Sequence, residues 1–390
     1  MTSKNRTWAE IDLDALKFNF TSIKAVLKPE TKVMCVIKSD AYGHGCAEFA
    51  RVLEGCGADA FAVATIEEAL LLRRMGHALP LLILGHVEAS LSEELVKNDI
   101  ASSVYDSGTA KALSVAAKKL NLPAKIHIAL DTGMTRIGFC AEEKSVDEII
   151  SICRLPGITA EGIFTHFAKS DEKDKSFSRE QFKKFTKTVN AIEARGLHIP
   201  IKHAANSAAI CDLPEYQLDM VRPGIILYGY YPSGEVNRAA LPLKPVMSIK
   251  SRITRIADAA AGTPVSYGGI YRAGAGGERI ATVPVGYADG YLRGYTGRVF
   301  MICSEKAVPV VGRICMDQCM INASSVNNIN VGDEITVMGR EGDTKIDAED
   351  LAKIAGTISY EILCMTGRRL TRVYLENGKA IRVHNYLNNW

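Results

Sequence analysis

Short apolar runs alternate regularly with longer amphipathic stretches from the start of the chain to about residue 230, and this alternation most limits the possible folds. Between the runs, apolar residues recur at helical spacing, as Cys46, Phe49 and Leu53 do. Strands that alternate with helices pair in parallel, and about eight such units fit a closed barrel. We therefore predict a (β/α)8 barrel, with a doubly wound open sheet as the alternative. The runs are residues 33–37, 60–64, 81–84, 101–105, 125–130, 160–165, 201–205 and 220–228.

The pattern changes after about residue 240, where β-rich pieces follow one another with glycine and proline between them. A chain of 390 residues is longer than one core usually supports. We predict a barrel domain over residues 1–240 and a mainly β domain over residues 241–390. The first strand, TWAEIDL, could pair with the second domain. One helix, IDAEDLAKIAGT, interrupts that domain, and Asp347 can cap its first turn.

Charge and cysteine content exclude several classes of protein. The net charge of +3 is spread along the chain without a basic block, which argues against a nucleic-acid partner. No apolar run has membrane-spanning or signal-peptide length, so we expect a cytoplasmic protein with no membrane partner. The ten cysteines are typical of buried thiols, as at Cys35, Cys153 and Cys364. Cys315 and Cys319 lack a nearby histidine, so we expect no metal site.

The segment VMCVIKSDAYGHG, residues 33–45, carries the main candidate for chemistry. It places Lys38 at the carboxyl end of a buried strand, just before a glycine-containing turn. Desolvation there disfavours the ammonium ion, and a neutral amine can form a Schiff base. A lysine that simply reaches solvent is the alternative. Functional side chains of a barrel lie at the carboxyl ends of its strands; candidates in such places are Lys38, Arg136, His166, Ser207, Arg222 and Gly224.

Several of these candidates suit an anionic ligand. Ser207, in HAANSAA, could hold a phosphate together with the backbone N–H groups after it, although an N-capping serine is the alternative. Arg222 and Gly224, in VRPG, could approach an anion closely, or form a plain turn. Arg136, in DTGMTRIG, could grip a carboxylate or phenolate, or form a surface ion pair. The histidines His166 and His203 suit an orienting role.

Taken together, the motifs resemble those of the alanine racemases, which are pyridoxal 5′-phosphate enzymes on an alanine-racemase-type barrel. The resemblance covers essentially the whole chain, in family order. It is carried by VIKSDAYGHG, DTGMTRIG, THFAKSD, HAANSAA, MVRPGIILYG, VSYGGIY, VGYADGY, GRICMDQ and TISYE.

The resemblance implies a role for each matching residue. Lys38 would bind the cofactor covalently and act as a base on one face of the substrate, and Tyr267 of the partner subunit would act on the other. His166, His203 and Arg222 would support them. Arg136 and the Met316 N–H would bind the substrate carboxylate. The cofactor-binding residues would be Lys38, Tyr42, Arg136, His166, Asn206, Ser207, Arg222, Gly224, Ile225 and Tyr360, and the entrance would be lined by Asp171, Arg293 and Arg313.

The implied reaction is the interconversion of L-alanine and D-alanine by a homodimer, which would supply D-alanine for peptidoglycan. A two-base inversion requires the pKa of a lysine and that of a tyrosine to move toward neutrality from about 10. Arginine facing the pyridine nitrogen would leave that nitrogen unprotonated, because a guanidinium does not readily give up a proton. Tyr360 and Tyr267 would narrow the pocket in favour of a methyl side chain.

One position departs from the family pattern. Many relatives carry a lysine, which becomes carbamylated, where this chain has Ala129, so Arg136 would lack that anionic partner. We expect a bound anion such as chloride beside Arg136, because a buried guanidinium without a counter-charge is costly. The alternatives to alanine racemisation are a serine or broad-specificity racemase, an amino-acid decarboxylase on the same barrel, and a non-catalytic cofactor-binding barrel protein.

Overall fold

The protein, described here by a computed structural model over residues 6–388, divides into two compact units. The barrel unit comprises Leu16–Ala41 and Cys46–Lys244. The β unit comprises residues 6–15, Tyr42–Gly45 and residues 245–388. Two segments that are early in the sequence therefore belong to the β unit.

The barrel unit is built on a sheet whose strands all pair in parallel, so the predicted fold class is confirmed. The strand order is β10-β2-β3-β4-β5-β6-β8-β9, and β7 pairs with β6. Backbone hydrogen bonds from Asp219 N to Lys202 O (3.2 Å) and from Arg222 N to Ala205 O (2.9 Å) link the two ends of that order. The strands are β2 (Lys32–Val36), β3 (Ala60–Val63), β4 (Leu81–Ile83), β5 (Ala101–Val104), β6 (Ala124–Asp131), β7 (Phe139–Cys140), β8 (Ile158–Phe164), β9 (Ile201–His203) and β10 (Met220–Val221).

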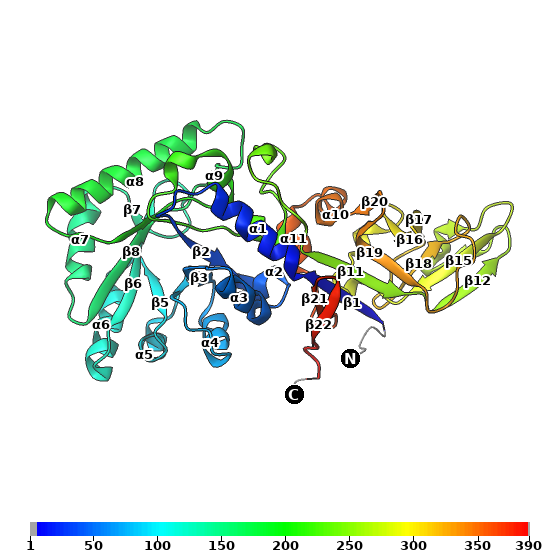
Figure 1. Ribbon diagram of the computed structural model, residues 1–390, viewed down its shortest axis with the longest axis horizontal. Helices are drawn as coiled ribbons and strands as arrows, with labels where there is room; N and C mark the ends of the chain where they lie inside the picture. Colours follow the sequence, from blue (N-terminus) through cyan, green and yellow to red (C-terminus); the bar gives the residue numbers. More distant parts are fainter. Residues whose placement is uncertain (1–5, 389–390) are drawn as a thin grey trace. The chain divides into compact units, whose positions relative to one another are not determined.

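Helices follow the barrel strands along the chain, and α4 to α8 lie outside the strands (Figure 1). Each turns an apolar face inward. In α7, for example, Val146, Ile149 and Ile150 are buried at a spacing of three to four residues, which places them on one face of the helix. The helices are α1 (Leu13–Ala25), α3 (Cys46–Gly55), α4 (Ile66–Arg74), α5 (Ser92–Lys97), α6 (Ser107–Leu120), α7 (Glu143–Cys153), α8 (Ser176–Ala194) and α9 (Ser207–Asp212).

The last predicted barrel strand, residues 220–228, is wrong in its length. Only Met220–Val221 is extended, and Ile225–Tyr228 forms a 3-10 helix. Pro223 has no N–H to donate to a neighbouring strand, so it ends the ladder. The apolar run continues because this short helix is fully buried, not because it belongs to the sheet.

The β unit contains a large sheet in which the first strand of the chain is central. β1 pairs in parallel with β21 and antiparallel with β11. The order is β12-β15-β18-β17-β16-β19-β11-β1-β21-β22, with β20 on β19; β13 and β14 form a separate pair. The strands are β1 (Thr7–Asp12), β11 (Met247–Arg252), β12 (Arg255–Ala259), β13 (Pro264–Val265), β14 (Tyr271–Arg272), β15 (Glu278–Val283), β16 (Phe300–Cys303), β17 (Lys306–Val311), β18 (Cys319–Asn322), β19 (Glu334–Glu341), β20 (Thr344–Ile346), β21 (Thr371–Glu376) and β22 (Lys379–His384).

Two helices accompany this sheet. Helix α10 (Ala348–Ala355) begins with a capping box in which the Asp347 carboxylate accepts from the N–H groups of Glu349 and Asp350, so the predicted cap is confirmed. Helix α11 (Ser359–Cys364) was not predicted from the sequence. None of the helices within residues 6–388 is long and apolar enough to cross a lipid bilayer.

All ten cysteines are free thiols. Cys35 is buried, as predicted. The same prediction is wrong for Cys364, which is exposed, and too strong for Cys153, which is half-buried.

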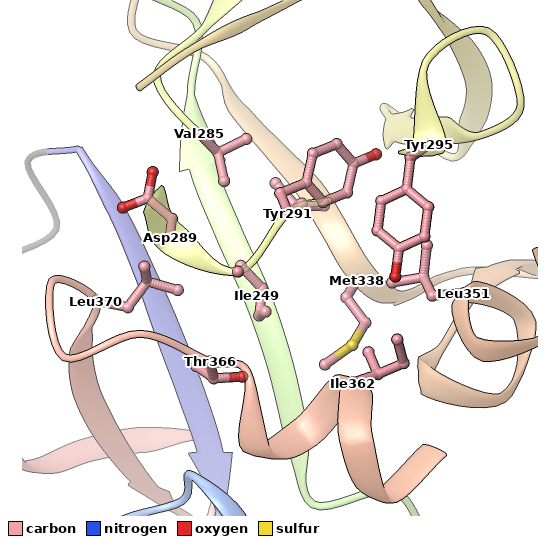
Figure 2. A pocket seen from close by; sticks show the side chains of 12 residues that line it. Ile249, Val285, Asp289, Tyr291, Tyr295, Met338, Leu351, Ile362, Thr366 and Leu370 are labelled. Carbon is pink, nitrogen blue, oxygen red and sulfur yellow. The ribbon is translucent and has the colours of Figure 1, made fainter. Parts of the chain in front are cut away.

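A small cavity lies in the core of the β unit (Figure 2). Its volume is about 20 Å³, which is enough for one water molecule. Tyr291 and Tyr295 line it with apolar neighbours such as Ile249 and Met338, and neither buried phenol oxygen has a hydrogen-bond partner among the residues that the structure describes. None of the predicted site residues lines this cavity, so we regard it as a defect in core packing.

Candidate active site

Lys38 lies two residues after the end of β2 and begins an unusual turn. The side chain is half-buried. The next four residues, Ser39 to Tyr42, all have φ angles between 50° and 54°, so the segment Lys38–Tyr42 (α2) contains a left-handed turn built from residues other than glycine. Left-handed helical backbone costs about 1–2 kcal/mol per such residue. Strain of this size is found where surrounding contacts enforce a functional geometry.

A buried arginine lies at the end of β10 and organises the carboxyl ends of the neighbouring strands. Arg222 is 3% exposed. Its guanidinium donates to His203 Nδ1 (2.8 Å) and to the carbonyl oxygens of Thr165 (2.7 Å) and Ala204 (3.2 Å). His166 Nδ1 lies 3.5 Å from the same guanidinium. The predicted residues His166, His203 and Arg222 therefore form one cluster.

The hydrogen bonds of Arg222 fix the protonation of two histidines. A guanidinium only donates, so His203 Nδ1 must accept, and the ring proton of His203 sits on Nε2. That Nε2–H donates to His127 Nδ1 at 2.9 Å. Two consecutive hydrogen bonds therefore run from Arg222 to His203 and from His203 to His127, and all three side chains are buried.

The electrostatics of the cluster agree with these directions. Burial, followed by the nearby Arg222 charge, lowers the pKa of His127 to about 3 and that of His166 and His203 well below the usual value. Burial and then Arg136 lower the pKa of Arg222 to about 9. At neutral pH the three histidines are therefore neutral, while Arg222 remains a cation.

Ser207 and Gly224 lie together at the carboxyl ends of β9 and β10. The Gly224 N–H donates to Ser207 Oγ at 2.8 Å, and both residues are buried. Asn206 is the N-cap of α9 and accepts from Ala209 N (3.0 Å). Ile225 follows directly at the start of the buried 3-10 helix. These four predicted residues are thus brought together, and the Ser207 hydroxyl hydrogen is left to donate to a ligand.

Tyr42 and Tyr360 are neighbours within the β unit. Their ring centroids are 5.9 Å apart, and the rings are tilted by 50°. Tyr42 is buried, and this burial, with a smaller effect of Cys364, raises the pKa of its phenol well above 10. Tyr42 is therefore a neutral hydrogen-bond donor near pH 7.

Arg136 differs from its prediction. We expected a buried guanidinium, but Arg136 is exposed in the single chain. It lies in the loop after β6, where Thr135 has a left-handed φ of 56° and its N–H donates to Asp131 Oδ1 (3.1 Å). Ala129 is buried in β6. Of the entrance residues, Asp171 and Arg313 are half-buried and Arg293 is exposed.

Tyr267 begins a 3-10 turn of the β unit and is 69% exposed. The residue before it, Ser266, has a φ of 64°, and its hydroxyl donates to Arg313 O at 2.6 Å. Met316, in the next loop, is also exposed, and its carbonyl accepts from Ala288 N at 3.0 Å. The chain alone thus presents both residues to solvent.

Two site-supporting residues were missed in the sequence. His127 lies two positions before Ala129 in β6, so both side chains point to the same face of the sheet, and this spacing was the available signal. Asp289 is fully buried and accepts from Arg6 at 2.6 Å and 3.0 Å. It belongs to the loop that holds the Met316 carbonyl, and nothing in its local sequence marked it. Within residues 6–388, no group of three or more metal-binding side chains is arranged to hold an ion.

Two family models match this chain. Residues 11–232 match the alanine racemase N-terminal domain, and residues 246–374 match the alanine racemase C-terminal domain. Each model thus lies largely within one of the two compact units, and together they cover most of the sequence.

Individual relatives agree along nearly the full length. An alanine racemase from Clostridium tetani is 48% identical over 384 residues, which are 97% of this chain and 98% of the relative. The solved alanine racemase of Clostridium difficile 630 has a TM-score of 0.96 at 44% identity and covers 99% of this chain and 100% of its own. That of Bacillus anthracis with bound L-Ala-P has a TM-score of 0.94 at 35% identity and covers 100% of both. This chain therefore belongs to the alanine racemase family.

Proposed function

We propose that this chain interconverts L-alanine and D-alanine, with Lys38 acting on one face of the substrate α-carbon and Tyr267 of the partner subunit on the other. The observation that carries the proposal is the 48% identity to an alanine racemase over 97% of the chain. Lys38, with its strained turn, and the Arg222 cluster at the carboxyl ends of the barrel strands support it.

Alanine racemases depend on pyridoxal 5′-phosphate, and the residues present fit this cofactor. Ser207 Oγ accepts from Gly224 N and keeps its own hydrogen for a phosphate oxygen. Tyr42, a neutral buried phenol, is a second donor for phosphate. Arg222 is a buried cation with no carboxylate among its hydrogen-bond partners in residues 6–388, so it suits an uncharged acceptor such as a pyridine nitrogen.

Bound pyridoxal 5′-phosphate would delocalise negative charge from the substrate α-carbon into its ring. The residues of the chain then have to move protons. The Lys38 amine takes or returns the α-proton on one face, and the Tyr267 phenol of the partner subunit does so on the other. Two bases on opposite faces invert the configuration without turning the substrate.

Arg222 would limit side reactions. Its pKa, although lowered to about 9, keeps it protonated at neutral pH, so it would donate a hydrogen bond to the pyridine nitrogen of the cofactor without transferring a proton. His203 and His127 hold the guanidinium in this orientation through their directed hydrogen bonds. An unprotonated ring withdraws less charge, which favours simple proton return over transamination.

The substrate is held through its carboxylate, by Arg136 and by the backbone N–H of Met316 of the partner subunit. Asp171, Arg293 and Arg313 at the entrance suit a zwitterion. Because Tyr360 and Tyr267 would narrow the pocket, we expect preference for a methyl side chain, although discrimination against serine by an apolar pocket is modest, about 10- to 100-fold.

We further propose a homodimer with shared sites. The apolar side chains of the β unit that are exposed in the single chain include Tyr267, Ile270, Tyr287 and Met316. Their loops are joined through hydrogen bonds from the Ser266 hydroxyl to Arg313 O and from Ala288 N to Met316 O. Exposed apolar surface of this kind is typical of an interface.

In such a dimer the exposed Arg136 would be covered, and we propose an anion such as chloride beside it and Ala129. An anomalous-scattering map of crystals grown with bromide is expected to show a peak at the Arg136 guanidinium. A map with only neutral solvent there, in a dimer that buries Arg136, would contradict this proposal.

The cellular role that we propose is supply of D-alanine for peptidoglycan, in the cytoplasm. Ten free thiols support a reducing compartment.

A chiral assay of the purified protein with L-alanine and L-serine tests the function. We expect L-alanine to reach an equal mixture of enantiomers, with a higher kcat/KM than L-serine. Lys38→Ala and Tyr267→Phe should each lower the alanine rate by at least about 100-fold, because each removes one proton-transfer group. Faster turnover of serine would favour a serine racemase, and carbon dioxide release without racemisation would favour a decarboxylase.

A further inference from the structure

The unit boundary falls inside the left-handed turn, between its third and fourth residues. Lys38 to Ala41 lie in the barrel unit, and Tyr42–Gly45 lie in the β unit. The left-handed φ angles continue through this boundary, with 51° at Ala41 and 50° at Tyr42. Contacts on both sides must therefore hold the turn, because residues with a Cβ do not favour this backbone.

On the barrel side, two carboxylates hold the first half of the turn. Glu68 accepts from Ser39 N (2.5 Å) and from Ala64 N (2.8 Å), which ties the turn to the end of β3. Asp40 accepts from Cys46 N (2.8 Å) at the start of α3. Side chains of the barrel unit thus hold the start of the turn.

On the β side, one arginine of β21 holds the second half. Arg372 is 1% exposed, and its Nε and Nη2 donate to Gly43 O at 3.0 Å and 2.8 Å. The remaining N–H groups donate to Gly367 O, Leu370 O and Thr366 O at 2.6–2.8 Å. All five donors of this guanidinium are used on backbone carbonyls.

A second side chain of β21 reinforces this contact. Tyr374 lies two residues beyond Arg372 and so on the same face of the strand, and its hydroxyl donates to His44 O at 3.2 Å. The fit is close: a Cβ on Gly43 would lie 2.5 Å from Leu363 O, and one on Gly45 would lie 1.9 Å from the Tyr374 hydroxyl. The segment therefore has one well-defined position on β21.

We propose that Arg372 is a positioning residue for the reaction, which holds the left-handed turn after Lys38 through the Gly43 carbonyl. Its importance for catalysis rests on the proposed role of Lys38 and Tyr42. A lysine at this position cannot replace it, because an ammonium has three donors on one atom and cannot reach four carbonyls arranged around a planar fork.

Hydrogen exchange of the cofactor-free protein tests the proposal independently of the reaction. In Arg372→Lys we expect amides of residues 41–45 to exchange at least about ten-fold faster, with little change in β16 to β19. The dissociation constant for pyridoxal 5′-phosphate should rise by at least about ten-fold, since Tyr42 is displaced. A matched control is Arg252→Lys, which makes the same change in β11 and should leave residues 41–45 unaffected.

Tyr374→Phe removes only the hydrogen bond from the Tyr374 hydroxyl to His44 O. This variant can be used for the same test if Arg372→Lys does not fold. It should accelerate exchange at residues 43–45 by a smaller factor. Exchange in this segment that is unchanged in both variants, or that rises only in step with the whole β unit, would overturn the proposal. An inactive wild-type protein that gives the expected exchange pattern would instead refute the proposed reaction.

Discussion

At the scale of single residues, the buried histidines make the stability of this protein depend on pH. His127 and His203 are fully buried and neutral, and burial lowers the pKa of His127 to about 3 and that of His203 well below its usual value. In the unfolded chain both titrate near 6.5. Between pH 6.5 and the folded pKa values, the unfolded state binds protons that the folded state excludes. The free energy of unfolding therefore has its full value, as far as these histidines are concerned, above pH 6.5, and it falls as the pH drops below 6.5.

The first prediction concerns how steeply the free energy of unfolding declines with falling pH. Each such histidine contributes up to about 1.4 kcal/mol per pH unit to the decline in the free energy of unfolding below pH 6. His127→Gln should make the decline shallower by about one proton, measured by urea unfolding from pH 7.5 to 5. His198→Gln is the control, because His198 is 73% exposed, and its slope should match the wild type. An unchanged slope in His127→Gln would contradict the assignment of a neutral buried histidine.

Some site residues could be found from local sequence and others could not. Lys38 and Arg222 follow apolar runs directly, so their place at strand ends was predictable. His127 was missed because its partner His203 is 76 residues away in the sequence, although its spacing from Ala129 places it on the same face of β6. The exposure of Arg136 in the single chain was not predictable from strand pattern, because the residue lies in the loop after β6.

Helices and strands with a clear periodicity of apolar residues were predictable from the sequence, and strained or short elements were not. The barrel strands and α10 follow from periodicity and from the Asp347 cap. The left-handed turn does not, because four residues with a Cβ adopt this backbone only when distant side chains such as Glu68 and Arg372 enforce it. Helix α11 is only six residues long, and its formation depends on packing.

A glycine in β8 makes the histidine contact possible. Gly162 pairs with His127, and a Cβ at Gly162 would lie 2.2 Å from His127 Nδ1. We expect Gly162→Ala to lower the free energy of unfolding by about 1–3 kcal/mol, because the imidazole must leave its hydrogen bond with His203. Gly55→Ala in α3, where a Cβ meets nothing within 4 Å, should be neutral or stabilising. Equal stabilities in urea unfolding would count against this account of the pair.

The N-cap of α10 provides a second test at this scale. Asp347→Ala should lower the free energy of unfolding by about 1 kcal/mol, because two N–H groups of the first turn lose their acceptor. Asp347→Asn keeps an acceptor oxygen and should stay close to the wild type, since the half-exposed ion pair with Lys345 contributes little. A large loss in both variants would show that the charge, and not the cap, is what matters.

For the whole molecule, the sequence pattern predicts the fold class and suggests that the first strand pairs with the second domain, but it does not predict that Tyr42–Gly45 joins the β unit. Strand β1 and Tyr42–Gly45 do so through pairing and side-chain contacts with β21. Assembly is likewise not decided by local pattern. The proposed homodimer is supported by the exposure of Tyr267 and Met316, which we propose to contact the substrate bound by the partner subunit.

The most direct test of the two-base, shared-site account is a hybrid dimer. Lys38→Ala and Tyr267→Phe chains, each inactive alone, are co-expressed with different tags, and the alanine racemase activity of the mixture is measured. Random pairing should restore about a quarter of the wild-type activity, because each hybrid contains one site with both bases intact. No recovery in hybrids that are shown to form would contradict the account.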